Sequence, residues 1–556
     1  MNKSNKRYEN LIAIILLVFL VGYILIPTLK TLNLSFLEGD SFSLSHYKNF
    51  LLLKTNRAFI INTILLGFST VIVCGLIGTS LAFFIGYFKF PCKNIVSKLL
   101  FTPVMVPGVI IVIAFIQLYG ESGIITKSIE MIFHLDKIPF KFAGFWGILF
   151  VHAYTQYIYF FINVSVAIRH IDYSTIEAAK NLGAKNSKIF FSIIFPVIKP
   201  ALLGSSIMTF IGGIGSFSAP SLIGGKFRVL TTQILFAKSN NHMDIASVEV
   251  ILLTLIAFVF LFVCRYYEKK SSFPAQVKSV EIKEIIIENS IVRKLFITFT
   301  FLLIFFIILP VITIFILSFV TSGTWLVEIF PKDFSLSNYI KIFTRSNTLK
   351  PFINSINMSV MAGLLGVVVA VPCSYLIVKT KSKFKFLIES LVMLPWALPA
   401  SAIAINLINT FNKTSIFSLN KILVGTYILL PLSYFIGILP LVFRSTNISM
   451  YNLNDAYEDA SKSLGASWIY TFRKITLPII MPGIVSGVVL GFIRCVGEYT
   501  SSAYLYTVAN KPISIAMVNA VFEYEIGLAM AYGVLTIVFI LILSFISSVL
   551  KNKYKW

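Results

Sequence analysis

Two copies of one polar segment interrupt the long apolar stretches of this chain: EAAKNLGAKNSKIFFSIIFP at residues 177–196 and DASKSLGASWIYTFRKITLP at residues 459–478. The acid, the glycine, an isoleucine and a proline recur with a constant offset of 282 residues. Self-similarity at a fixed offset indicates a structural unit that is used twice. Two equivalent polar loops in an apolar chain therefore predict two docking elements for one two-fold partner.

The composition places most of the chain in a membrane. Of its 556 residues 57% are hydrophobic and only 13% are charged, and the mean hydropathy is +0.87. Apolar runs long enough to cross about 30 Å of hydrocarbon recur along it, which predicts an all-α polytopic membrane protein. We place about twelve spans, at 11–29, 58–85, 99–119, 145–167, 201–217, 248–264, 295–320, 352–378, 387–408, 420–443, 484–503 and 526–549.

The duplication extends well beyond the two loops. FSLSHY at 42–47 recurs as FSLSNY at 334–339, with an offset of 292. An even number of spans in each half gives both copies the same orientation, so we expect two parallel six-helix repeats. We predict a first repeat at 1–265, a polar linker at 266–293 and a second repeat at 294–556. Prolines that recur at the same offset predict breaks in the third and ninth spans, and they are Pro103, Pro107, Pro395 and Pro399.

The net charge of +24 points to membrane topology rather than to nucleic acid. Lys and Arg concentrate in the segments that lie inside if the N-terminus is cytoplasmic, as the positive-inside rule requires. We therefore expect both termini in the cytoplasm and no nucleic-acid partner, because no soluble basic domain is present. A cleaved signal peptide is the alternative for residues 11–29, but this run is long and lacks a small-residue cleavage site.

Metal and disulfide chemistry find no support in the sequence. The five cysteines and five histidines are scattered and lack the spacing of metal ligands or of a disulfide framework. We expect no metal site, and packing roles for the cysteines.

Each polar loop has the local signals of two short helices joined by a glycine. In the first loop Ser174 lies three residues before Glu177, the spacing of a capping box. Gly183 interrupts the pattern, a second short helix is expected over 185–191, and prolines mark the start of the next span. In the second loop Asn454 or Asp455 is the expected cap. Such a segment at a membrane surface can fit a groove in a soluble partner, whereas an ordinary interfacial helix is the alternative for one copy alone.

Two ionisable residues lie inside the predicted eleventh span. Arg494 and Glu498 are four residues apart, which predicts one helix face. They form either a local ion pair or a face that borders the translocation pathway. The equivalent residues of the first half are Gly212 and Ser216, so a pathway built from them is asymmetric. Helix packing is the alternative role for Gly212.

The residue spacing in both loops resembles that of the EAA loop of ABC importer permeases. With two halves of six spans each, the resemblance to these permeases covers nearly the whole chain. The first copy has Phe195 where that family has Leu, and the second has Asp-Ala-Ser in place of Glu-Ala-Ala. Fusion of two permease units in one chain is most similar to the ferric-iron and thiamine importers. The resemblance implies that each loop contacts a cytoplasmic ATPase through these residues: Glu177, Ala178, Ala179, Gly183 and Pro196, and Asp459, Ala460, Ser461, Gly465 and Pro478.

The resemblance also implies partners. The sequence contains no G-x-x-x-x-G-K-[ST] phosphate loop, so we expect no enzymatic activity and no cofactor in this chain. ATP and Mg would be held by a separate ATP-binding subunit, present in two copies, and an extracytoplasmic binding protein would deliver the substrate. We predict a permease of the bacterial cytoplasmic membrane that carries ferric iron by alternating access. Thiamine, phosphonate or polyamine are the alternative substrates. A twelve-span secondary transporter and a passive channel or scaffold are the alternatives of another class.

Overall fold

The structure is a computed structural model that describes residues 3–39, 41–136, 138, 140–270, 289–321 and 331–553. Helices dominate these residues, together with one short antiparallel pair of strands, β1 (Leu37–Glu38) and β2 (Ser41–Phe42). The all-α prediction is confirmed. Most of the predicted linker, residues 271–288, lies outside the described residues.

The described helices agree with the predicted number of spans. Eleven are long and apolar enough to cross a membrane, and one bent pair makes up to twelve. Several predicted boundaries were wrong, and two examples lie in the second half. The helix assigned to 420–443 is α21 (Leu429–Tyr451), and the one assigned to 484–503 is α24 (Leu477–Val496), whose continuous helical segment begins at Trp468. Hydropathy locates an apolar run but not the caps that end its helix.

The two halves form the same series of elements, at the offsets that the sequence predicts. Both copies of the second span contain 34 residues. The equivalent pairs are α3 (Ser45–Leu52) and α17 (Ser337–Thr344), α4 (Lys54–Tyr87) and α18 (Ser346–Lys379), α7 (Gly108–Tyr119) and α20 (Ala400–Phe411), α9 (Gly144–Arg169) and α21, α10 (Tyr173–Asn181) and α22 (Asp455–Ser463), α11 (Asn186–Ile189) and α23 (Trp468–Thr471), the π turns Phe190–Ile194 and Phe472–Thr476, α12 (Phe195–Ile214) and α24, and α13 (Ser218–Ile223) and α25 (Thr500–Leu505).

The remaining helices complete the two halves. They are α1 (Lys3–Leu20), a π turn at Val21–Leu25, α2 (Ile26–Phe36), α5 (Lys93–Leu99), α6 (Thr102–Met105), α8 (Ile124–Ile132), α14 (Leu230–Ser239), α15 (Met243–Lys270), α16 (Ser290–Leu317), α19 (Lys385–Met393), the 3-10 turns Leu394–Trp396 and Ile416–Ser418, α26 (Ile513–Phe522) and α27 (Ile526–Lys553).

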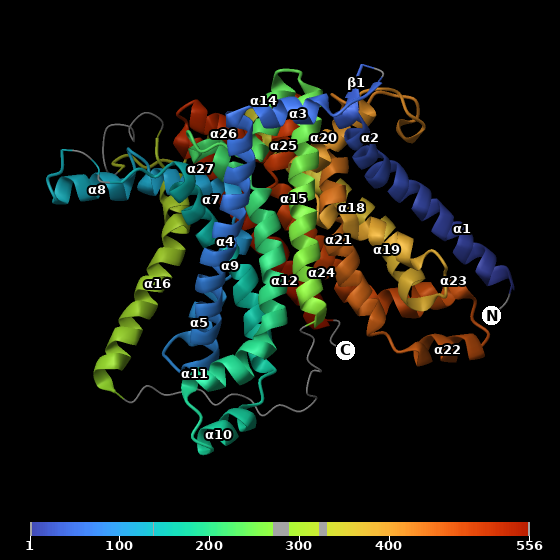
Figure 1. Cartoon of the computed structure of the whole chain (residues 1–556), viewed down its shortest axis with the longest axis horizontal. Coiled ribbons are helices and arrows are strands. Elements are labelled where there is room, and N and C mark those ends of the chain that lie inside the picture. The colour runs from blue at the N-terminus through green and yellow to red at the C-terminus, as the bar shows by residue number, and fades with distance from the viewer. Residues whose placement is uncertain are drawn as a thin grey trace. The chain divides into compact units, whose positions relative to one another are not determined.

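Contacts divide the chain into two compact units. One unit contains residues 1–49, 234–251 and 336–556, and the other contains 50–233 and 252–335. The first helices of the chain, α1 and α2, therefore belong to the unit that holds α18, α21 and α24. Likewise α16, which starts the second half, belongs to the unit that holds α4, α9 and α12 (Figure 1).

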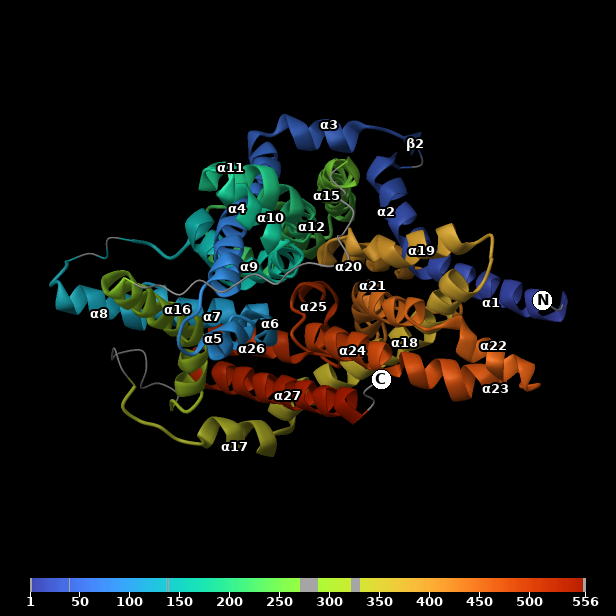
Figure 2. The same cartoon turned by 90° about the horizontal axis from the view of Figure 1, so that it is seen from below.

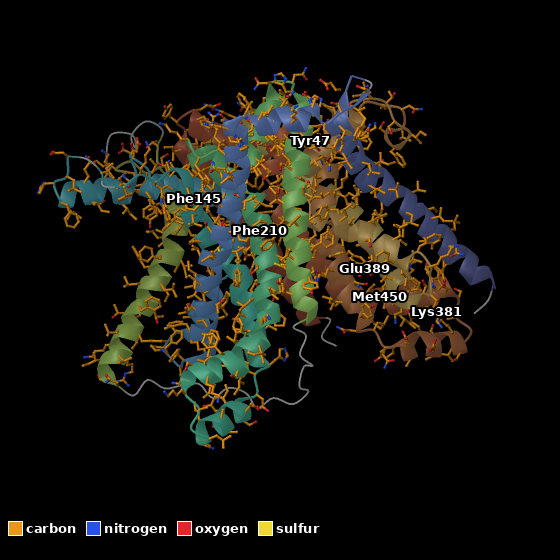
Figure 3. The ribbon with its side chains drawn as sticks, viewed as in Figure 1. Tyr47, Phe145, Phe210, Lys381, Glu389 and Met450 are labelled. Atoms are coloured by element: carbon orange, nitrogen blue, oxygen red, sulfur yellow. The ribbon has the colours of Figure 1, made fainter. Side chains whose placement is uncertain are left out.

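In the unit that contains α4, α9 and α12, these three helices form the core. Gly213 of α12 allows close approach, because a Cβ there would lie 3.3 Å from the side chain of Thr70. Phe210 of α12, labelled in Figure 3, stacks its ring on Phe260 of α15, with 3.8 Å between centroids. Small residues at such crossings are the usual means of helix packing in membranes.

In the other unit α18, α21 and α24 form the equivalent core. A Cβ at Gly487 would lie 3.0 Å from the Cβ of Ser445. Met450, labelled in Figure 3, is fully buried at the end of α21, where it packs with Leu453 and Ile480. This cluster lies where α21 leads into the second polar loop.

The proline pairs break the third and ninth spans as predicted. Pro107 immediately precedes α7, and Pro399 immediately precedes α20. The helical segments Lys385–Ala397 and Ala400–Phe411 meet at an angle of 113°. A proline lacks the backbone donor that would continue the preceding helix.

Candidate functional site

The first loop, residues 172–196, begins with α10, which leaves the end of α9 (Figures 1 and 2). Its cap is Asp172, whose side chain accepts a hydrogen bond from the Ser174 backbone N–H at 3.0 Å. The predicted capping box of Ser174 and Glu177 was wrong, because the cap lies two residues before Ser174 and the helix already starts at Tyr173. In the second loop, residues 454–478, Asn454 caps α22 in the same way, as one of the two predicted candidates.

A glycine of left-handed conformation ends the first helix of each loop. Gly183 has φ +79° and Gly465 has φ +82°. The Gly183 N–H donates to Lys180 O at 2.9 Å, and the next N–H donates to Ala179 O at 2.9 Å. The second loop repeats this pattern. This is a Schellman motif, which satisfies the last carbonyls of a helix and favours glycine.

The turn predicted at each glycine is therefore present. In each loop it connects two short helices, as the sequence predicted. After α11 and after α23 the chain does not break at the prolines, however. A π turn joins each short helix directly to the following span, and Pro196 and Pro478 are the second residues of the α-helices that follow the π turns. Pro200 and Pro482 lie inside the spans.

The face of each loop that points away from its own spans carries the same residue types. Leu182 is 88% exposed and its equivalent, Leu464, is 90% exposed. Four other exposed pairs at the offset of 282 keep their residue type: Glu177 and Asp459, Ala178 and Ala460, Lys180 and Lys462, and Gly183 and Gly465. The exposed pairs outside 177–183 and 459–465, such as Lys188 and Tyr470, do not. Within the second loop Lys462 Nζ lies 3.2 Å from Asp459 Oδ1.

The inward face of the second loop is polar. Glu458 is only 6% exposed, and its Oε1 accepts a hydrogen bond of 2.5 Å from the Thr476 hydroxyl. Lys379, the last residue of α18, lies with its Nζ 3.9 Å from Glu458 Oε2, and it also pairs with Asp455. The Lys379 ammonium, by this hydrogen bond and by its charge, holds the pKa of Asp455 below its ordinary value. Ser461 is buried and shares a hydrogen bond of 2.9 Å with the Thr471 hydroxyl.

An aromatic contact adds a second attachment of this loop to α18. The Trp468 indole N–H donates to the Tyr375 hydroxyl at 2.6 Å. Trp468 also stacks on Phe472, with 5.6 Å between ring centroids and 18° between planes.

The inward face of the first loop is apolar. Ile176 is 4% exposed and Ile189 is 4% exposed, and both belong to the core cluster that contains Leu81, Ala82 and Ile194. The partly buried Ala179 packs against the same cluster. The first loop is therefore seated on α4 and α9 by hydrophobic contact.

Arg494 and Glu498 do not share a helix face, contrary to the expectation. Helix α24 ends at Val496 and Gly497 is its C-cap. The Glu498 carboxylate accepts a hydrogen bond of 2.9 Å from the Ser501 N–H, at the start of α25. Among the described residues Arg494 forms no ion pair with Glu498, and its side chain is exposed. A glycine and a new helix start replace the continuous helix that the apolar run predicted.

The first-half equivalents follow the same geometry. Gly212 lies inside α12, where a Cβ would come 2.8 Å from Gln156 Oε1. This contact supports a packing role for Gly212. Ser216 lies beyond the end of α12, and its carbonyl accepts a hydrogen bond of 2.7 Å from the Thr231 hydroxyl.

Sequence reasoning missed a buried acid, Glu249, in the helix predicted at 248–264. It is 2% exposed, and its Oε2 has no hydrogen-bond partner in the part of the chain that the structure describes. An acid inside an apolar run was the available signal. Across the same described ranges, no three His, Cys, Asp or Glu side chains lie together as metal ligands.

Comparisons with known proteins find one family twice in this chain. The model of the binding-protein-dependent transport system inner membrane component matches residues 78–272 and 362–555. Each match contains one of the two loops.

Several curated relatives span most of the chain, among them three permeases. A probable ABC transporter permease protein of Sinorhizobium fredii is 30% identical over 466 residues, covering 83% of this chain and 82% of the relative. A ferric transport system permease protein of Actinobacillus pleuropneumoniae is 25% identical over 534 residues, covering 95% and 76%. An Fe(3+)-transport system permease protein of Haemophilus influenzae is 25% identical over 481 residues, covering 86% and 87%.

Proposed function

Because the chain belongs to the family of binding-protein-dependent transport system inner membrane components, we propose that its two loops dock a separate ATPase and that it imports ferric iron. It is a multi-pass permease of an ABC import system, not itself an enzyme, and such a system includes an ATPase and a binding protein. The family excludes the secondary transporter considered above.

The docking proposal rests on a comparison of the exposed and the buried residues of the two loops. Within 177–183 and 459–465, the exposed positions keep acid, alanine, lysine, leucine and glycine in both copies, and only Asn181 and Ser463 differ. The buried positions change from apolar to polar, as from Ile176 to Glu458. Exposed loop residues ordinarily vary more than buried ones. The exposed residues from the acid to the glycine stay the same while the buried residues beneath them change, and this supports one kind of partner surface for both loops.

The chemistry of that face fits a groove in a soluble protein. Leu182 and Leu464 each offer an apolar side chain almost fully exposed beside an acid and a lysine. Burying one leucine in a groove contributes about 1.5–3 kcal/mol. The partner is a cytoplasmic ATP-binding subunit in two copies, which holds ATP and Mg.

In the proposed cycle the loops and both termini face the cytoplasm. The ATPase dimer closes on ATP, the loops transmit this movement to α12 and α24, and the spans open outward to accept substrate from the binding protein. The chain is divided into permease repeats at 1–265 and 294–556. A bordering role for Arg494, Glu498, Gly212 and Ser216 in the pathway stays a prediction.

Ferric iron is proposed because two relatives that span most of the chain are named as ferric permeases. Thiamine, phosphonate and polyamine remain the alternatives. Selection of the metal is assigned to the binding protein.

Reconstitution tests the proposal. The chain, its ATPase and the neighbouring binding protein are placed in proteoliposomes with ATP inside or outside. We expect uptake of radioactive ferric iron only when all three proteins and ATP are present. Uptake of thiamine or a phosphonate instead would replace the substrate, and uptake without the ATPase would overturn the docking proposal.

A further inference from the structure

The two loops are attached to their spans by different chemistry at equivalent positions. In the second half, Lys379, Glu458 and Thr476 form a contiguous group that we call the polar anchor. At offsets of 292 and 282 the first half has none of these groups. Its equivalent residues are Tyr87, Ile176 and Ile194.

The polar anchor joins three helices. Lys379 is the last residue of α18, Glu458 lies in the first turns of α22, and Thr476 immediately precedes α24. The side chains of Lys379 and Glu458 are 6% and 8% exposed, so salt screens their attraction only weakly. The Thr476–Glu458 hydrogen bond has a preferred distance and direction. The Lys379 ammonium, 3.9 Å from Glu458 Oε2, attracts the carboxylate by charge rather than by a hydrogen bond.

The apolar seat of the first loop has no such directionality. Ile176 contacts its cluster through non-directional burial, which a small displacement of α10 changes little. A buried charge that loses its partner is by contrast strongly unfavourable. The two seats therefore resist sliding to different degrees.

We propose that Lys379 and Glu458 are positioning residues that make α22, the end of α18 and the start of α24 move as one body, while α10 shifts over its apolar seat. Their role in transport rests on the proposed docking of the ATPase. The polar anchor itself consists only of residues of this chain, so it can be tested without the ATPase. A displacement delivered at the second loop then reaches α18 and α24 directly, whereas the first loop absorbs part of it.

Hydrogen exchange on the purified full chain in lipid nanodiscs, without ATPase, tests the anchor. Glu458→Gln keeps the shape and an acceptor for Thr476 but removes the charge, and Lys379→Met removes the ammonium. In either variant we expect about tenfold faster exchange of the α22 amides, a loss of protection equivalent to about 1.4 kcal/mol, and no change in α10. Tyr87→Phe is the matched control, because the Tyr87 hydroxyl has no hydrogen-bond partner among the described residues.

A second variant tests the inference even if leaving one buried charge without its partner destabilises the fold. It replaces the polar anchor with the equivalent residues of the first half. The triple variant Lys379→Tyr, Glu458→Ile and Thr476→Ile installs the apolar seat of the first half. We expect protection of α22 to return to within about threefold of the original, with lower uptake per ATP hydrolysed in the reconstituted system.

Three outcomes would overturn the inference: unchanged exchange in α22 after the single substitutions, equal acceleration in α10 and α22, or unaltered uptake per ATP in the triple variant. Failure of the original chain to bind any ATPase would instead refute the proposed function. The exchange result would be unaffected by that failure, so the two are distinguishable.

Discussion

The glycine that ends the first helix of each loop allows a sharp test of why the loops have their shape. Gly183 and Gly465 have positive φ, and in the described structure nothing lies within 4 Å of a Cβ built at either position. A substitution therefore meets no neighbouring atom of this chain. Its cost within the chain comes from backbone handedness alone.

That cost can be estimated from the backbone. An L-residue in the left-handed region costs about 1–2 kcal/mol, and replacing glycine recovers about 0.4–1 kcal/mol by restricting the unfolded chain. The net cost for alanine is about 1 kcal/mol per loop. Valine costs more, because a β-branched residue at positive φ is a genuine outlier. Asparagine costs less, since it visits this region readily.

Handedness and volume predict different orders of activity. If the Schellman turn is what matters, uptake per ATP falls in the order Gly, Asn, Ala, Val, although Asn is larger than Ala. Because 1.4 kcal/mol is a tenfold change in an equilibrium constant, we expect alanine in one loop to lower the population of the competent conformation about fivefold. Two distant substitutions add, so alanine in both loops lowers it about thirtyfold.

The assay is ATP-driven uptake in proteoliposomes, with thermal unfolding of the isolated chain as the control for insertion and folding. We expect the unfolding midpoint of the spans to stay within a few degrees. An Asn variant as inactive as the Val variant would refute the handedness argument and indicate a steric contact with the ATPase. A fully active Val variant would refute the role of the turn altogether.

Three further predictions concern single side chains. Leu464→Ser, and equally Leu182→Ser, leaves the unfolding midpoint of the chain unchanged but weakens ATPase binding at least about tenfold, measured by titration in nanodiscs. Gly78→Ala destabilises the chain by about 1–3 kcal/mol, because its Cβ would come 2.4 Å from the backbone oxygen of Tyr157. Gly86→Ala on the same helix, whose Cβ would come no closer than 3.4 Å to the side chain of Ile168, does not; thermal unfolding compares them. Glu249→Leu removes a buried acid whose Oε2 has no hydrogen-bond partner among the described residues, and raises stability by about 1–3 kcal/mol. A concomitant loss of uptake identifies a functional acid.

The architecture could be predicted largely because duplication and hydropathy are both visible in the sequence. The constant offsets located every equivalent pair of helices at the loops, and the prolines located the breaks before α7 and α20. Helix ends were less accessible. Asp172 was overlooked as a cap because Ser174 fits the capping pattern better, and only the backbone shows which residue precedes the first turn.

Pairings between distant segments were the least accessible. In the sequence Lys379 is one of four closely spaced lysines, and Glu458 lies beside the motif acid Asp459, so nothing there indicates that the two residues pair. Hydrophobicity also does not say which neighbours a span packs with. Nothing in the apolar run of α16 indicates that it belongs to the unit of α4 and α9.

Fusion of two permease units into one chain explains how the loops could diverge on one face only. In a homodimer every substitution appears in both copies, so both seats would have to stay the same. In this chain each loop occurs once per molecule, and its seat is free to change with the spans beneath it. The outward faces do not have this freedom if both meet the same partner surface. These two constraints explain the observed pattern. The Leu–Gly turn is the same in both loops, whereas the buried residue at one equivalent position is the apolar Ile176 in the first loop and the acid Glu458 in the second.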